Sequence, residues 1–137
     1  MKIKEPNLNI KNNKILYPVI VFDLGGVLMD WNPYYLYCDT LGLAKDDVDR
    51  FLSDVDFYNW NIEQDRGRSF EEATIELSSR FPEYRDLIFA YDKKYIYSVK
   101  GSFQPVVDIL EKIKSADYPL YALSNWPAEK FHQVRPE

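Results

Sequence analysis

Residues 19–28 (VIVFDLGGVL) constrain the fold more than any other part of this chain. Four apolar residues lead into Asp23, and two glycines follow after Leu24. A short apolar run of this kind predicts a buried strand, with an acid at its carboxyl end. In open α/β sheets the ligand crevice lies outside the carboxyl ends of the strands, and glycines let backbone amides approach an anion closely. An aspartate that only caps a turn is the alternative reading.

A second apolar strand is predicted at residues 118–125 (YPLYALSN), and it ends in Ser124 and Asn125. An amphipathic helix precedes it, with apolar residues at positions 103, 106, 107, 110 and 113 and Pro105 in its first turn. Two strands joined by a helical crossover predict a parallel pair and an α/β fold. The Asp23 and Ser124 ends would then lie on the same edge of the sheet.

Helical patterns fill the segment between these strands. We expect helices at 33–41, 45–53 and 84–97, and a helix that starts at Ser69, where Ser69 and Glu72 form a candidate capping box. Residues 57–62 are interpreted as an aromatic connector, and the first strand is expected to run over 15–23. The predicted organisation is an α/β core domain from residues 1–31 and 99–137, with a helical domain at 32–98 inserted into it.

Composition narrows the function class. The net charge of −5 and the lack of a long Lys/Arg run argue against nucleic-acid binding, and favour a small-molecule site. No stretch approaches the roughly 18 apolar residues of a membrane span, and the polar segment 1–14 lacks the apolar run of a signal peptide. Cys38 is the single cysteine and is expected to pack in the interior. We therefore expect a cytoplasmic protein with no membrane partner and a loose N-terminal tail.

The two strand-end motifs together resemble the haloacid dehalogenase-like (HAD) hydrolase superfamily. Residues 21–28 look like its first motif and residues 123–125 like its second. Residues 30–33 (DWNP), 60–61 (WN) and 65–68 (DRGR) extend the likeness to the branch that contains glucose-1-phosphatase-like proteins and 2-haloacid dehalogenases. The resemblance implies a Rossmann-like parallel sheet and a helical cap that closes over the active site. The family's third and fourth motifs, a lysine and an acidic pair, would lie beyond Glu137, so we expect the sheet in this chain to be incomplete.

The expected reaction depends on the carboxylate of Asp23. A carboxylate such as Asp23 can attack phosphorus, giving an aspartyl-phosphate that water hydrolyses. Because this carboxylate repels a phosphate dianion, a hard divalent cation such as Mg²⁺ is expected as cofactor. By resemblance, the Asp23 carboxylate and the Gly25 carbonyl would bind the metal. The phosphoryl oxygens would be held by a set of backbone amides and side chains at the two strand ends, namely Leu24, Gly25, Gly26, Ser124 and Asn125. For Ser124–Asn125, capping of a helix that opens near Pro127 is the competing interpretation.

One position departs from most phosphatases of the superfamily, which carry a second aspartate two residues after the nucleophile. Here that position is Gly25. Asp30 is a candidate replacement acid, with turn formation as the more common role of such a residue. In the helical domain, Trp60 and Arg66 are candidate substrate-binding residues, with packing and solvated surface charge as their respective alternatives.

The predicted function is hydrolysis of a small phosphorylated metabolite, with a sugar phosphate as the leading example. The first alternative is a 2-haloacid dehalogenase, which also uses a strand-end aspartate. The second is a truncated, non-catalytic fragment or binding module, and on the family pattern we expect the 137-residue chain alone to hydrolyse no phosphate ester. The strand over residues 15–22 would then have an unpaired edge, which predicts self-association.

Overall fold

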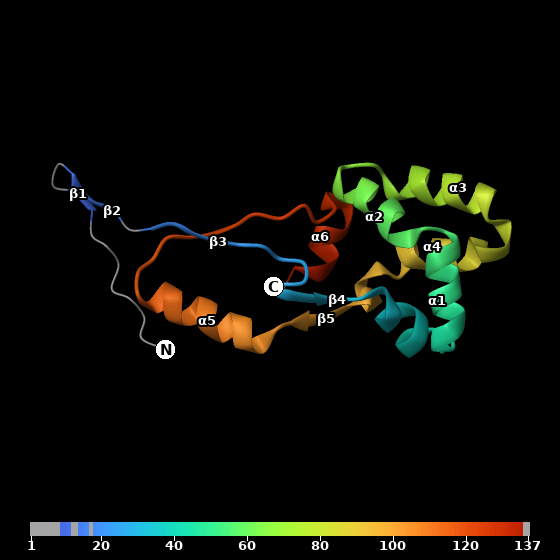
Figure 1. Ribbon diagram of the computed structural model, residues 1–137, viewed down its shortest axis with the longest axis horizontal. Coiled ribbons are helices and arrows are strands. Elements are labelled where there is room, and N and C mark those ends of the chain that lie inside the picture. The colour runs from blue at the N-terminus through green and yellow to red at the C-terminus, as the bar shows by residue number, and fades with distance from the viewer. Residues whose placement is uncertain (1–8, 12–13, 17, 136–137) are drawn as a thin grey trace.

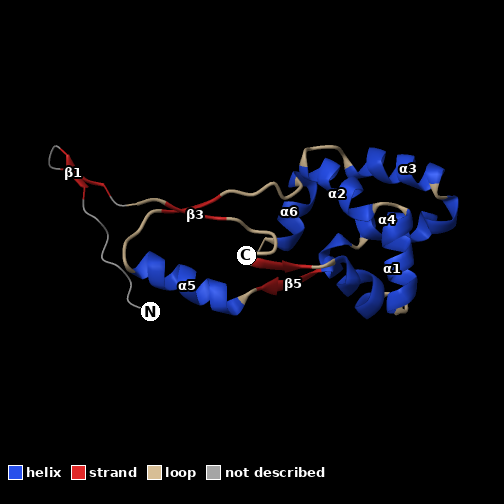
Figure 2. Ribbon diagram, in the orientation of Figure 1, coloured by secondary structure: helices blue, strands red, loops and turns tan. Residues whose placement is uncertain are grey.

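The computed structural model describes residues 9–11, 14–16 and 18–135, and within them the protein is a mixed α/β structure. Helices α1 to α4 gather at one end of an elongated molecule, whereas β3, β6 and α5 extend along the other (Figure 1). Figure 2 shows the same division, with three short two-stranded pairings in red and the helices in blue. The fold thus has a helical part and a strand part of different character.

The expected parallel pair is present. Strand β3 (Ile20–Phe22) pairs with β6 (Leu120–Ala122), with Ile20 opposite Leu120 and Phe22 opposite Ala122. Helix α5 (Gln104–Ser115) precedes β6 and supplies the crossover, with Pro105 in its first turn. Among the strands of the described chain, β6 is the single partner of β3, so the other edge of β3 is unpaired.

The first predicted strand, at 15–23, is wrong as one continuous element. Strand β2 (Lys14–Leu16) pairs antiparallel with β1 (Asn9–Lys11), and β3 belongs to the separate pairing with β6. Pro18 stands between β2 and β3. Because proline has no N–H to donate to a ladder, it separates the two strands. The loose tail expected at residues 1–14 lies partly outside the described residues. Its described residues include strand β1.

A two-stranded antiparallel ribbon joins the two parts. Strand β4 (Met29–Trp31) pairs with β5 (Val99–Ser102), so the chain enters and leaves the helical part through neighbouring strands. The ribbon lies at the boundaries 31/32 and 98/99 that the sequence pattern places between core and insert. A register shift interrupts its pairing between Met29 and Trp31, and Gly101 adopts a positive φ of 103° there.

The insert is helical throughout. Ser69 starts its third α-helix as expected, since the Ser69 hydroxyl accepts a hydrogen bond from the Glu72 amide at 3.2 Å. The elements between the two ribbon strands are η1 (Tyr35–Thr40), α1 (Lys45–Asp54), α2 (Phe57–Asp65), α3 (Phe70–Arg80), η2 (Pro82–Tyr84), α4 (Arg85–Lys93) and η3 (Tyr95–Ser98).

Several predicted boundaries in the insert need correction. The aromatic connector at 57–62 is part of helix α2, and Asp56, with a φ of 51°, makes the break from α1. Aspartate tolerates this left-handed conformation better than most residues, so a separate helix starts directly after it. The helix expected at 84–97 divides into α4 and η3, and the one at 33–41 is a short π-helical turn.

The hydrophobic core lies mainly in the helical part. Phe57 is buried with its ring centroid 4.9 Å from that of Tyr91, and Phe70 packs 5.8 Å from Tyr95 in an edge-to-face arrangement. In contrast, helix α5 has no buried residue, and Leu110 lines an open groove of about 490 Å³ with Phe22 and Leu120. The apolar stripe of α5 therefore faces the strands but is only half-buried.

Helix α6 (Ala128–Val134) packs against the helical part. The buried ammonium of Lys130 lies 2.5 Å from Asp92 Oδ1 and also donates to the Asp92 carbonyl at 2.9 Å. Its Nζ is 4.5 Å from the centroid of the Phe70 ring. These contacts fix the segment that follows β6 against α3 and α4.

In the described part of the chain, no helix has the length and apolar character needed to cross a membrane.

Candidate functional site

The carboxyl ends of β3 and β6 lie side by side. Beyond the paired residues, the Leu123 amide donates to the Phe22 carbonyl at 2.9 Å, so the parallel alignment continues to the end of β3. Asp23 directly follows this point on one chain segment, and Ser124 and Asn125 follow it on the other. The structure therefore brings the two predicted motifs to the same edge of the sheet.

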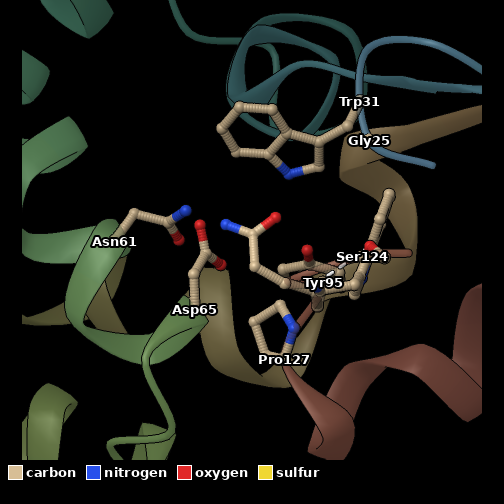
Figure 3. Close-up of a pocket in the computed structure, with 9 residues that line it drawn as sticks. Gly25, Trp31, Asn61, Asp65, Tyr95, Ser124 and Pro127 are labelled. Atoms are coloured by element: carbon tan, nitrogen blue, oxygen red, sulfur yellow. Dashed lines mark hydrogen bonds between the residues drawn. The ribbon is translucent and has the colours of Figure 1, made fainter. Parts of the chain in front are cut away.

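A pocket of about 250 Å³ lies between these strand ends and helix α2 (Figure 3). The strand-end loops, β4, α2, η3 and the residue before α6 all contribute to its wall. The lining residues are Gly25, Trp31, Asn61, Asp65, Tyr95, Ser124, Asn125, Trp126 and Pro127. Three of the predicted site residues, Gly25, Ser124 and Asn125, are thus in one pocket. Asp23, Leu24 and Gly26 are not among the residues that line it.

The loop after β3 is tightly closed by its own backbone. The Leu24 carbonyl accepts hydrogen bonds from the amides of Leu28 and Met29, and the Gly26 amide donates to the Met29 carbonyl at 2.9 Å. The Leu24 amide donates to Asp23 Oδ1 at 2.7 Å. Two amides expected to hold phosphoryl oxygens, those of Leu24 and Gly26, are therefore already bonded within the loop, which corrects that part of the prediction.

Ser124 stands in a turn and does not cap a helix. Its hydroxyl oxygen accepts from the Trp126 amide at 3.1 Å, and the residue before α6 is Pro127. The capping interpretation of Ser124–Asn125 is therefore wrong. Because the hydroxyl oxygen is the acceptor in this bond, its proton is available to a ligand in the pocket.

Asp23 and Gly25 offer hard oxygen donors. Asp23 is exposed, and within the described chain no residue donates to its Oδ2 or to the Gly25 carbonyl oxygen. Carboxylate and carbonyl oxygens are ligands that Mg²⁺ prefers, usually together with water and substrate oxygens. The chemistry of this pair fits Mg²⁺, although the described residues contain no group of three or more His, Cys, Asp or Glu that could hold an ion.

Gly25 is packed against Trp126. A Cβ at position 25 would lie 3.3 Å from Trp126 Cζ3 and 3.4 Å from Cε3, closer than ordinary van der Waals contact. A side chain here would require the indole to move. The local packing thus explains in physical terms why this position carries glycine.

Of the carboxyl groups in the described chain, Asp65 alone lines the pocket, and it was not among the site residues predicted from the sequence. Its carboxyl points from α2 into the pocket (Figure 3), and burial raises its pKa from 3.8 to about 6. The neighbouring arginines do not neutralise the charge of an ionised Asp65, since Arg66 pairs with Glu63 at 2.6 Å and Arg68 pairs with Glu76. The signal in the sequence is the spacing of Asn61 and Asp65, which places both on one face of a helix.

Asn61 is oriented by a buried tyrosine. The Tyr91 hydroxyl donates to Asn61 Oδ1 at 2.9 Å, which leaves the amide nitrogen for a ligand. Within the described chain, the buried indole N–H groups of Trp31 and Trp126 face the hydroxyls of Tyr91 and Tyr95 without reaching full hydrogen-bond geometry. The pocket therefore combines an uncompensated carboxyl with the free amide nitrogen of Asn61, which suits a hydroxylated ligand.

The other candidates lie elsewhere. Trp60 is buried in the helical core and its Nε1 donates to the Ala73 carbonyl at 3.3 Å, whereas the Arg66 side chain is exposed. Asp30 accepts a hydrogen bond from the Tyr35 hydroxyl at 3.0 Å. None of these three residues lines the pocket, and their side chains are engaged elsewhere, by core packing, a surface ion pair and a hydrogen bond respectively.

No protein-family model matches the chain, and comparisons with curated proteins and with solved structures found no match.

Proposed function

We propose that this chain carries the active site of a cytoplasmic, Mg²⁺-dependent phosphatase of the HAD type. The proposal rests on one observation: the parallel pairing of β3 and β6 brings Asp23 to the same sheet edge as Ser124, beside a polar pocket. The Rossmann-like sheet and the helical cap of that superfamily belong to the proposal. The α/β topology and the helical insert between β4 and β5 support it.

In the proposed reaction, an Asp23 carboxylate oxygen attacks phosphorus and the ester bond to the leaving group breaks. The Ser124 hydroxyl donates to a phosphoryl oxygen, and the Gly25 amide, which makes no bond in the loop, is a further donor. Water then releases phosphate from the aspartyl-phosphate. Mg²⁺ bound by Asp23 and the Gly25 carbonyl would neutralise charge between the carboxylate and the phosphate.

The pocket favours a small, hydroxylated substrate such as a sugar phosphate. Asp65 accepts and Asn61 donates hydrogen bonds, while Trp31, Tyr95 and Trp126 provide aromatic surface for the apolar face of a sugar ring. Its volume of about 250 Å³ leaves room for a small metabolite only. The helical part thus sets the substrate preference in this proposal.

The test uses beryllofluoride, which mimics a phosphoryl group on a carboxylate. With Mg²⁺ present, ¹⁹F NMR of the protein should reveal a bound species that Asp23→Asn abolishes, because the amide is no longer a nucleophile or an anionic ligand. Asp117→Asn is the matched control, since Asp117 follows α5 and asparagine tolerates its positive φ of 59°. An unchanged signal in Asp23→Asn would refute the proposal. Release of chloride from 2-chloropropionate without metal would instead favour the dehalogenase.

A further inference from the structure

We propose that Asp65, on the helical part, is the acid that protonates the leaving-group oxygen. The inference rests on the proposed phosphatase function and goes beyond it, by assigning the proton donor to the insert and not to the loop after β3. Asp65 would touch the ester oxygen of the bound substrate, and so would be a catalytic residue.

The loop position next to the nucleophile does not provide this acid. Gly25 has no side chain, and the Trp126 ring occupies the space that a side chain there would need. Asp30 is the nearest other carboxyl in sequence, but it accepts from the Tyr35 hydroxyl and does not line the pocket. The proton donor therefore has to come from another element.

Asp65 is placed to supply it. It lines the same pocket as Gly25 and Ser124, from the opposite wall formed by α2 (Figure 3). A substrate held with its phosphate at the strand ends would extend its leaving group toward α2. Among the residues that the structure describes, Asp65 is the sole carboxyl in the lining, so no second described acid competes for this position.

The surroundings keep the Asp65 carboxyl protonated further toward neutral pH than an ordinary aspartate. Burial raises its pKa to about 6, and no residue of the described chain gives it a hydrogen bond or an ion pair. The titratable groups that face it are Tyr91 and Tyr95, whose pKa values burial raises far above neutrality, so both remain uncharged. The protonation state of Asp65 thus depends on the burial of its carboxyl and on the bound substrate.

The proposed steps balance as follows. An Asp23 oxygen forms a bond to phosphorus, the bond from phosphorus to the ester oxygen breaks, and that oxygen takes the proton of Asp65 and leaves as an alcohol. The Asp65 carboxylate then accepts a proton from water as the water oxygen attacks phosphorus. Cleavage of the bond between phosphorus and Asp23 releases phosphate, so one ester and one water give one alcohol and one phosphate.

The experiment compares two leaving groups in the natural full-length protein. Asp65→Asn should lower kcat/KM for an alkyl phosphate by about 10²- to 10⁴-fold, the usual effect of a general acid. It should lower kcat/KM for p-nitrophenyl phosphate by less than about tenfold, because kcat/KM reports only the steps up to departure of the leaving group and nitrophenolate leaves without a proton. Glu71→Gln is the control, since it removes one exposed carboxylate of the helical part that makes no ion pair within the described chain, and both kcat/KM values should be unchanged. Equal losses on both substrates would overturn the assignment.

A second measurement does not depend on turnover. Carboxyl ¹³C NMR should give Asp65 a titration midpoint near 6, and the signal should be absent in Asp65→Asn. A midpoint near the ordinary value of about 4 would overturn the assignment. If wild-type protein with Mg²⁺ forms no bound beryllofluoride species, the proposed function and this inference are both overturned. A normal beryllofluoride species with no difference between leaving groups would overturn the role of Asp65 alone.

Discussion

The helical part and the strand part of this protein differ in how they use apolar residues. In the helical part, Phe57 and Phe70 are only 1% exposed. In the strand part, Val21 is 53% exposed, Tyr121 62% and Leu123 73%. The difference indicates that stability resides mostly in the helices, whereas the predicted nucleophile follows a strand that has little cover.

Both parts of the molecule contribute to the candidate site. The pocket takes its walls from both parts, with Ser124 from the strand part and Asn61 and Asp65 from α2. Lys130 on α6 ties the segment after β6 to the helices through Asp92. The well-packed part thus provides a firm wall against which the less covered strand ends are positioned.

The largest expected effect is loss of a core aromatic. Phe57→Ala should lower the free energy of unfolding by about 3–5 kcal/mol, because it leaves a cavity among Tyr91, Trp60 and neighbouring side chains. Chemical denaturation monitored by circular dichroism measures this. A loss below about 1 kcal/mol would contradict the view that the helical part dominates stability.

The next effect comes from the ion pair between the two parts. Lys130→Met should cost about 3 kcal/mol, because it leaves the Asp92 carboxylate largely buried without its cation. Burial raises the pKa of Asp92, but the hydrogen bonds from Lys130 and Lys93 outweigh it and lower the pKa below 3.8.

The pair should therefore be pH-dependent. A lowered pKa in the folded state means that the stabilisation is present above the unfolded pKa of about 3.9, and is lost as pH falls through the folded value. Denaturation of wild type and Lys130→Met between pH 7 and 2 should show the difference in stability shrinking at the acid end. A difference that stays constant over this range would exclude the pair as its cause.

A smaller effect is expected at the start of α3. Ser69→Ala should cost about 1 kcal/mol, since the Glu72 amide loses its acceptor. Ser69→Asp retains a capping oxygen and should be close to wild type, which distinguishes capping from packing. Thermal unfolding of the three proteins provides the comparison.

The smallest effect on stability is expected in the strand part. Val21→Lys should change the unfolding free energy by less than about 0.5 kcal/mol because Val21 is exposed. We nevertheless expect it to reduce self-association, since a lysine next to the unpaired edge of β3 disfavours strand pairing between copies.

Light scattering over a range of concentrations tests this. Ile75→Lys is the matched control, because Ile75 is similarly exposed at 55% but lies on α3, and it should leave association unchanged. A wild-type chain that stays monomeric at all concentrations would contradict the expectation that the unpaired edge of β3 promotes self-association.

Local sequence patterns were sufficient for much of the fold. The apolar runs gave β3 and β6, and Ser69 with Glu72 gave the start of α3. They failed at 57–62, where a dense aromatic segment looked like a connector. Its helical state depends on burial of Phe57 and Trp60 against α3 and α4, which are distant in the sequence.

The sequence by itself determined the parallel pair, the inserted helices and the placement of Asp23 and Ser124 at one sheet edge, because these depend on strand direction and periodicity. Only the tertiary structure decided which groups meet in the pocket. It brought Asp65 to Ser124, packed Trp126 against Gly25, and engaged the amides of Leu24 and Gly26 in the loop. Contacts and desolvation of this kind arise between segments far apart in the chain, and no local pattern encodes them.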